Sequence, residues 1–367
     1  MSQRTQLVRL AACAMLAAAA HAGGETKSDY DRLSTDLERL EAALTAQNTQ
    51  QGVDIGYLLR SSYATSSDDI YQPAPGTDLG GFRLQDASLW ARGHIGNYEV
   101  FIRADGSDAV DFPPIAGGAP GAMNVRDAWA RAPLTDGVNL YFGNFRCPVL
   151  NSSMLDEGKL AFIDRTRLGQ MFDVYQAGAA VVGDFDAFHV KLAAQNGADG
   201  SGDELGIVAR GEYKVGEGAK QREGALGAEG FDATFGLGYF DDGVADDVNA
   251  LVFDAYATMD AFSVHAELMD MGEGLATMMG LTAGEEATPF TATFGYRVTD
   301  EWEVLARFQD LDDSLETTQV GAGLNYYVQG HAAKWQVNVS QLDNDVDDGL
   351  ILQVGLSLGS AFPNGAF

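Results

Sequence analysis

The C-terminal part of the chain alternates apolar and polar positions with a period of two. Trp335, Val337 and Val339 fall on one face, and polar residues fall between them. After an acidic turn the alternation resumes, with its large apolar members at Leu350, Leu352, Val354, Leu356 and Leu358. Because successive side chains leave opposite faces of a pleated strand, this period predicts strands with one apolar face and one polar or small face.

The same pattern recurs from Gly52 onward and predicts sixteen strands. They cover approximately residues 52–64, 82–93, 97–106, 123–132, 137–146, 174–184, 186–196, 204–216, 230–241, 246–259, 261–272, 288–299, 301–312, 316–328, 331–343 and 349–362. Short turns alternate with longer connections, except that 217–229 is long where a short turn is expected. Short turns on one rim and long loops on the other are typical of outer-membrane barrels, whose closure pairs every strand edge. We therefore expect residues 52–367 to form an all-β membrane barrel of about 16 antiparallel strands.

Nearly all strand-borne lysines and arginines fall on the face opposite the large apolar residues. A charge at the lipid midplane costs about 2–4 kcal/mol, so a barrel in a bilayer requires this segregation. The polar face then lines a water-filled lumen, where fixed charges filter ions. The wall residues predicted to set ion preference are Arg92, Arg103, Arg297, Arg307 and Lys334.

The long connection 147–173 mixes apolar residues with charges. An exposed loop of this length and apolar content is unusual, so we expect it to fold into the lumen and narrow it. Its charged residues Lys159, Arg165 and Arg167 would then face ions at the constriction. The alternative is a loop packed at a contact between the subunits of a trimer.

The N-terminal residues predict export. Residues 1–22 have the features of a secretory signal, with Arg4 and Arg9 before an apolar run and a small-x-small cleavage site at 20–22. Residues 23–51 contain the one helical segment, whose apolar seam has the spacing of a short coiled coil on the periplasmic side. A single amphipathic helix packed on its own chain is the alternative.

Composition narrows the partners and the chemistry. The formal net charge of −30 argues against nucleic acid or anionic lipid as a partner. Cys147 is the only cysteine after the predicted signal, and no apolar run there is long enough for a helical membrane span. The histidines lack partners at metal spacing and the serines lack a nucleophile context, so we expect neither an enzyme nor a cofactor.

Most of the excess acid lies in the long connections, where a solvated rim is the simplest interpretation. Residues 343–349 have some of the oxygen spacing of a calcium loop but lack its glycine and its closing glutamate. The candidate ligands there are Asp343, Asp345 and Asp347.

Residues 124–197 contain a series of short motifs: Asp127-Ala128, then Gly143-Asn144-Phe145-Arg146-Cys147-Pro148, then Phe162-Ile163-Asp164-Arg165, then Gln176-Ala177-Gly178 and Gln195-Asn196-Gly197. Together these motifs resemble the phosphate-selective porin O/P family. The family tends to have lysine at the position of Arg146 and glutamate at that of Asp164. The resemblance implies a sixteen-stranded, trimeric, passive outer-membrane channel with its third loop folded inward. It also implies that Arg126, Arg146 and Arg165 favour anions.

Three hypotheses follow for the function. The first is an outer-membrane porin, set in lipid as a homotrimer, that passes small hydrophilic solutes or ions, among them anions such as phosphate. The second is a plugged barrel that anchors or connects the envelope, with acidic loops that bind divalent cations. The third is a secreted, soluble β-protein. Inward-facing glycines and a polar wall favour the open channel.

Overall fold

The computed structural model describes residues 52–67, 81–106, 123–197, 204–218, 222–243, 247–346 and 348–359. The predicted signal sequence, the predicted helix within 23–51 and the last eight residues, 360–367, lie outside the described residues.

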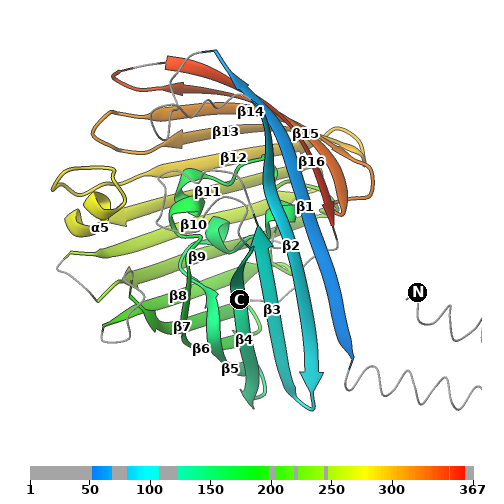
Figure 1. Ribbon diagram of the computed structural model, residues 1–367, viewed down its shortest axis with the longest axis vertical. Coiled ribbons are helices and arrows are strands. Elements are labelled where there is room, and N and C mark those ends of the chain that lie inside the picture. Colours follow the sequence, from blue (N-terminus) through cyan, green and yellow to red (C-terminus); the bar gives the residue numbers. More distant parts are fainter. Residues whose placement is uncertain are drawn as a thin grey trace, which may run out of the picture. The chain divides into compact units, whose positions relative to one another are not determined.

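Sixteen antiparallel strands close into a single barrel, in which β1 pairs with β16 on one side and β2 on the other (Figure 1). The strands are β1 Val53–Ser66, β2 Gly81–Ile95, β3 Tyr98–Gly106, β4 Met123–Thr135, β5 Val138–Arg146, β6 Tyr175–Phe185, β7 Phe188–Asn196, β8 Leu205–Val215, β9 Phe231–Asp241, β10 Asn249–Met259, β11 Phe262–Met271, β12 Phe290–Arg297, β13 Trp302–Asp310, β14 Thr318–Tyr327, β15 Ala333–Asp343 and β16 Asp348–Gly359. Each strand lies within a few residues of its predicted range. The predicted fold class, an all-β barrel of about 16 strands, is confirmed.

The register explains why the alternation in the sequence is so regular. Across β15 and β16, Val337 lies opposite Val354, and Gln336 lies opposite Gly355. Residues that face each other across a strand pair share one face of the sheet, so large residues meet large ones outside and small or polar ones meet inside.

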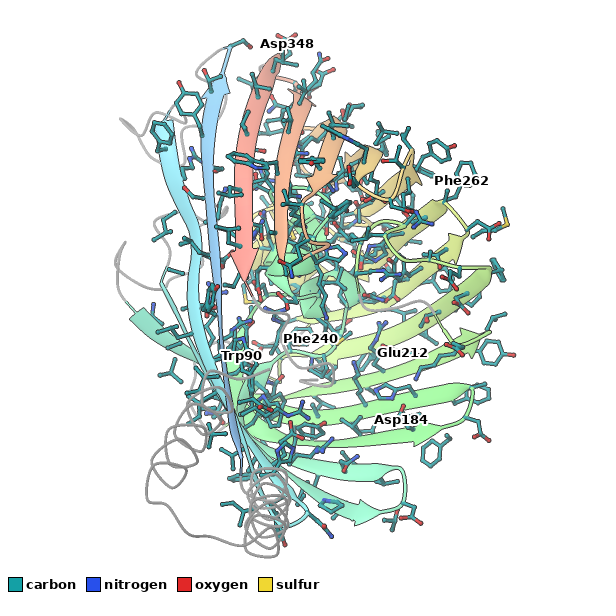
Figure 2. All side chains as sticks on the ribbon, turned by 90° about the vertical axis from the view of Figure 1, so that its right-hand side faces the viewer. Trp90, Asp184, Glu212, Phe240, Phe262 and Asp348 are labelled. Carbon is teal, nitrogen blue, oxygen red and sulfur yellow. The ribbon has the colours of Figure 1, made fainter. Side chains whose placement is uncertain are left out.

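The outer face of the barrel is apolar and exposed. Val339, Leu352 and Phe294 keep 37%, 39% and 51% of their surface accessible. Paired aromatic residues add to this face, as where Phe262 and Tyr296 lie with ring centroids 4.7 Å apart. Phe262 lies at the periphery of the barrel (Figure 2). Soluble monomers rarely expose an apolar surface that extends round the whole molecule. Tyr98, Val100 and Ile102 of β3 also face outward and are exposed.

The two rims of the barrel differ. On one rim the connections are tight turns, with backbone in the left-handed region at Asp186, Asp260 and Gly96. The connection 216–230 is the long exception on that rim. The opposite rim carries the longer loops, of which 272–289 contains the short helix α5 (Glu273–Met278). Within the described residues, none of the helices has the length and apolar character needed to cross a bilayer.

Candidate functional site

The loop between β5 and β6 crosses the interior of the barrel (Figure 1). We call residues 147–174 the inner loop. It contains three short helical turns, α3 Asn151–Met154, η1 Glu157–Lys159 and α4 Arg167–Met171. At its start, the carbonyl oxygen of Val149 accepts a hydrogen bond from Arg210 of β8 at 2.9 Å. The backbone N–H of Ser152 then donates to Glu267 of β11 at 2.7 Å.

The middle of the inner loop reaches strands on the far side of the ring. The carbonyl oxygen of Ala161 accepts hydrogen bonds from Asn325 of β14 at 2.9 Å and Gln336 of β15 at 2.8 Å. The N–H of Ile163 donates to Asn338 at 2.7 Å. Because β15 lies seven strands from β6 by the shorter way round the ring, these bonds place the loop across the lumen.

Glycines on the inner wall accommodate the apolar side chains of this loop. A Cβ atom on Gly355 would lie 3.0 Å from Cδ1 of Ile163, and one on Gly321 would lie 3.2 Å from Cε1 of Phe162. Both apolar side chains are 3% exposed. These two inward-facing glycines therefore make space for the loop rather than for an open passage, contrary to our interpretation of the sequence.

A cluster of arginines and carboxylates surrounds the base of the inner loop. Its basic members are Arg103 of β3, Arg126 of β4, Arg146 of β5 and Arg165 of the loop, and its acidic members are Asp105, Asp127, Glu157 and Asp173. Members of opposite charge lie within salt-bridge distance of one another. With as many carboxylates as guanidinium groups, the cluster carries little net charge when every member is ionised.

Glu157 lies at the centre of this cluster. Its carboxylate accepts from Arg146 at 2.6 Å, Arg165 at 3.1 Å and Arg103 at 3.2 Å. Burial alone would raise the pKa of Glu157, but the surrounding arginines outweigh burial and hold that pKa well below 4.5. Glu157 is therefore a permanent counter-charge to the arginines.

Tyr175, the first residue of β6, completes the cluster. Its hydroxyl oxygen lies 2.5 Å from Nη2 of Arg103 and 2.6 Å from Nε of Arg146. The guanidinium carbon of Arg146 also lies 4.9 Å from the centroid of the ring. Sequence reasoning missed this role, because a tyrosine at the start of a strand has no pattern that distinguishes it from a tyrosine at the membrane interface.

A second segment enters the barrel from the rim of tight turns. We call residues 222–230, which lie between β8 and β9, the inner turn. The carbonyl oxygen of Gly224 accepts from Tyr256 of β10 at 3.1 Å, and the N–H of Ala225 donates to Glu303 of β13 at 2.5 Å. The sequence marked this connection as unusually long, but we assigned it no function.

The inner loop and the inner turn meet inside the barrel. The N–H of Glu223 donates to the carbonyl oxygen of Lys159 at 3.1 Å, and the N–H of Ala161 donates to Oε2 of Glu223 at 2.8 Å. Arg307 of β13 donates to both carboxylate oxygens of Glu223, at 3.3 and 3.1 Å, and to the carbonyl oxygen of Asp164 at 2.8 Å. One wall residue therefore binds both segments.

The predicted pore residues thus have five kinds of position. Four of them belong to the cluster, namely Arg103, Arg126, Arg146 and Arg165. Arg307 and the fully buried Lys334 bind the inner loop from the wall. Arg92 pairs with Glu99, whereas Arg297 contacts Asp300 and Ala228. Lys159 and Arg167 lie half-buried on the inner loop itself. Arg126 keeps 26% of its side-chain surface accessible, and Arg92 and Arg297 each keep 21%, which makes these three the more accessible of the predicted cations in these ion pairs.

The acidic segment 343–349 lies at the tip of the β15–β16 hairpin. Asp343 lies opposite Asp348 in the strand register, and Asp347 is outside the described residues. Within the part of the chain that the structure describes, no three acidic, histidine or cysteine side chains are grouped so that they could hold a metal ion.

No protein-family model matches the chain, and no curated protein matches it in sequence. Solved structures match its fold. They include a loop-deletion mutant of OmpT, an outer membrane protein of Vibrio cholerae, with a TM-score of 0.57, 12% identity, and coverage of 84% of this chain and 99% of that chain. A mutant of the Rh. blastica porin matches with a TM-score of 0.55, 15% identity, and coverage of 84% and 100%. The anion-selective porin from Comamonas acidovorans gives 0.56, 11%, and coverage of 85% and 100%.

The fold is that of the porins. At these identities the similarity extends to the barrel and not to the residues inside it. In this chain the barrel has an outward apolar face and an enclosed interior that holds the inner loop and the inner turn. In the described chain, the charged side chains of that interior occur mainly in pairs of opposite sign.

Proposed function

We propose that the protein is an outer-membrane porin through which small hydrophilic solutes or ions diffuse passively. The observation that carries the proposal is the closed sixteen-stranded barrel, apolar outside and charged inside, with one loop folded across its interior. A closed barrel is the only β-sheet in which every backbone N–H and C=O group is hydrogen-bonded within lipid. Its polar interior is suited to contact with water and hydrated solutes and not to contact with lipid. We further propose that the barrel associates as a trimer, as the resemblance to the O/P porins implies.

The proposed ion preference rests on the basic residues of the interior. An ion in the lumen interacts most strongly with the fixed charges that it can approach closely. The accessible side chains of Arg126, Arg92 and Arg297, together with the half-buried Lys159 and Arg167, are therefore the candidates to attract anions, phosphate among them. The more deeply buried Arg103, Arg146, Arg165, Arg307 and Lys334 would act by shaping the constriction.

Conductance across planar bilayers tests this function. We expect purified protein to form discrete channels, with a reversal potential in a potassium chloride gradient that reports a mild preference for chloride. Arg126→Gln should shift that potential toward cations. Replacement of chloride by phosphate measures whether phosphate is favoured. The absence of channels from folded protein would refute the proposal, and an unchanged potential in Arg126→Gln would refute the assignment of Arg126.

A second candidate function is favoured by one observation. The inner loop and the inner turn are hydrogen-bonded to each other through Glu223, as expected for a plugged barrel. Such a barrel would serve as an envelope anchor, with its acidic loops available to divalent cations. Folded protein without channel activity, together with calcium-dependent binding between cells or vesicles that carry it, would support this function over the first.

A further inference from the structure

The inner turn packs inside the barrel, although it connects two strands at the rim of tight turns. Gly224 has a φ of +86°, and a Cβ there would lie 2.6 Å from Oε2 of Glu303. Only glycine therefore lets the backbone pass against the wall at this point. Glu223, Ala225 and Ala228 are 0%, 0% and 4% exposed, although they belong to a connection on the rim of tight turns.

The inner turn follows the inner faces of several strands. Tyr256 of β10, Arg297 of β12 and Glu303 of β13 all bond to it. Because these residues point into the lumen, the segment occupies volume that solutes would otherwise use. A turn of two to five residues, as elsewhere on this rim, would leave that volume open.

We infer that the inner turn is a second constriction element, attached to the inner loop through Glu223 and Arg307. This inference rests on the proposed porin function. The narrowest part of the path is then set where the two segments meet and not by the inner loop alone. The contacts are the hydrogen bonds of Glu223 to Lys159 and Ala161, and the bonds of Arg307 to Glu223 and Asp164.

The attachment is permanent at ordinary pH. Burial opposes ionisation of Glu223, but Arg307 and the neighbouring His265 lower its pKa to about 2. The groups that face Glu223 are Arg307 on β13, His265 on β11 at 3.8 Å, and the N–H of Ala161 on the inner loop. Mild acid therefore leaves the carboxylate charged, and removal of the contact requires a change of sequence.

The experiment compares four proteins in planar bilayers: wild type, a variant that lacks residues 222–228, Glu223→Gln and Glu229→Gln. Glu229 lies in the same segment but is exposed, so Glu229→Gln is the matched control for the loss of one carboxylate. Circular dichroism and resistance to trypsin establish that each barrel is folded. Glu223→Gln provides the test if the deletion variant does not fold.

We expect the deletion to raise single-channel conductance roughly two- to fivefold, because conductance increases with the open cross-section of a water-filled constriction. Glu223→Gln should raise it roughly 1.5-fold or more, because the segment is then less firmly held. Glu229→Gln should behave as wild type. Equal conductance in folded wild type, Glu223→Gln and deletion variant would overturn the inference.

The outcomes separate this inference from the porin proposal. If wild type conducts and the variants conduct equally, the inner turn is not a constriction and the porin proposal stands. If wild type is silent and the deletion variant conducts, the inner turn closes the barrel and the porin proposal fails. If all folded variants are silent, both are refuted.

Discussion

Arg307 donates to both carboxylate oxygens of Glu223 while the same guanidinium group bonds to the carbonyl oxygen of Asp164. The guanidinium carbon also lies 4.1 Å from the centroid of the Phe162 ring. A planar cation with five N–H donors can serve several acceptors at once, which lysine cannot do in this geometry. Arg307 therefore connects the inner loop, the inner turn and β13.

Replacement of Arg307 should destabilise the barrel by leaving Glu223 charged and unpaired in a buried position. Arg307→Met is expected to lower the free energy of unfolding by about 3–5 kcal/mol. Arg307→Met combined with Glu223→Gln should recover a large part of that loss, because the stranded charge is removed. Urea unfolding in lipid vesicles measures both. If the effects of the two substitutions are additive, the contact between Arg307 and Glu223 contributes no measurable free energy of interaction.

Stability should fall in acid, with a defined contribution from Glu223. Its folded pKa of about 2 lies below its ordinary value of 4.5, so its stabilisation is present above about pH 4.5 and is lost as pH falls toward 2. Two and a half pKa units correspond to about 3 kcal/mol. Glu223→Gln should therefore show a flatter dependence of unfolding free energy on pH between 4.5 and 2. An unchanged slope would mean that the folded and unfolded proteins bind protons at this site alike.

Glu157 should contribute in the same direction, because its pKa is also held below 4.5. Its stabilisation is likewise present above that value and is lost as pH falls through the folded pKa.

The barrel could be predicted because the bilayer imposes a simple rule on each strand. Val337 and Val339 must face one way and Gln336 and Asn338 the other, so the alternation reports both the strand and its faces. The inward direction of Arg103 and Arg307 follows from the same rule. Neither prediction requires knowledge of distant contacts.

The pairing inside the lumen could not be predicted for two physical reasons. The inner loop binds the wall largely through backbone atoms, such as the carbonyl oxygen of Ala161, which every residue possesses. The charged pairs are also distant in sequence, as with Arg103 and Glu157 or Arg307 and Glu223. A glutamate in a long polar turn therefore has the same local pattern as a solvated one, and only the fold shows that Glu223 is buried.

Enlargement of Gly355 should displace the inner loop. A Cβ there would already lie 3.0 Å from Ile163, so Gly355→Val would overpack the contact and cost about 1–3 kcal/mol. Ile163→Ala alone leaves a cavity and costs about 2–5 kcal/mol. The double variant should lose less than the sum, because the valine methyls fill the space that the isoleucine vacates. Urea unfolding and trypsin cleavage at Arg165 and Arg167 report stability and loop position. A loss equal to the sum would show that the side chains do not share this space.

A charge on the outer face distinguishes a membrane barrel from a soluble one. Val339 lies near the middle of β15 and is 37% exposed, whereas Val346 lies in the β15–β16 connection and is 70% exposed. In a bilayer, Val339→Arg should cost about 2–4 kcal/mol, because the guanidinium group lies near the lipid midplane. Val346→Arg, which makes the same chemical change at the rim, should cost much less, since that depth is near or beyond the lipid interface. The free energies of unfolding of wild type and both variants, measured in lipid vesicles, give these two costs. A small cost at both positions would mean that the apolar face of β15 does not contact lipid, and the porin proposal would lose its physical basis.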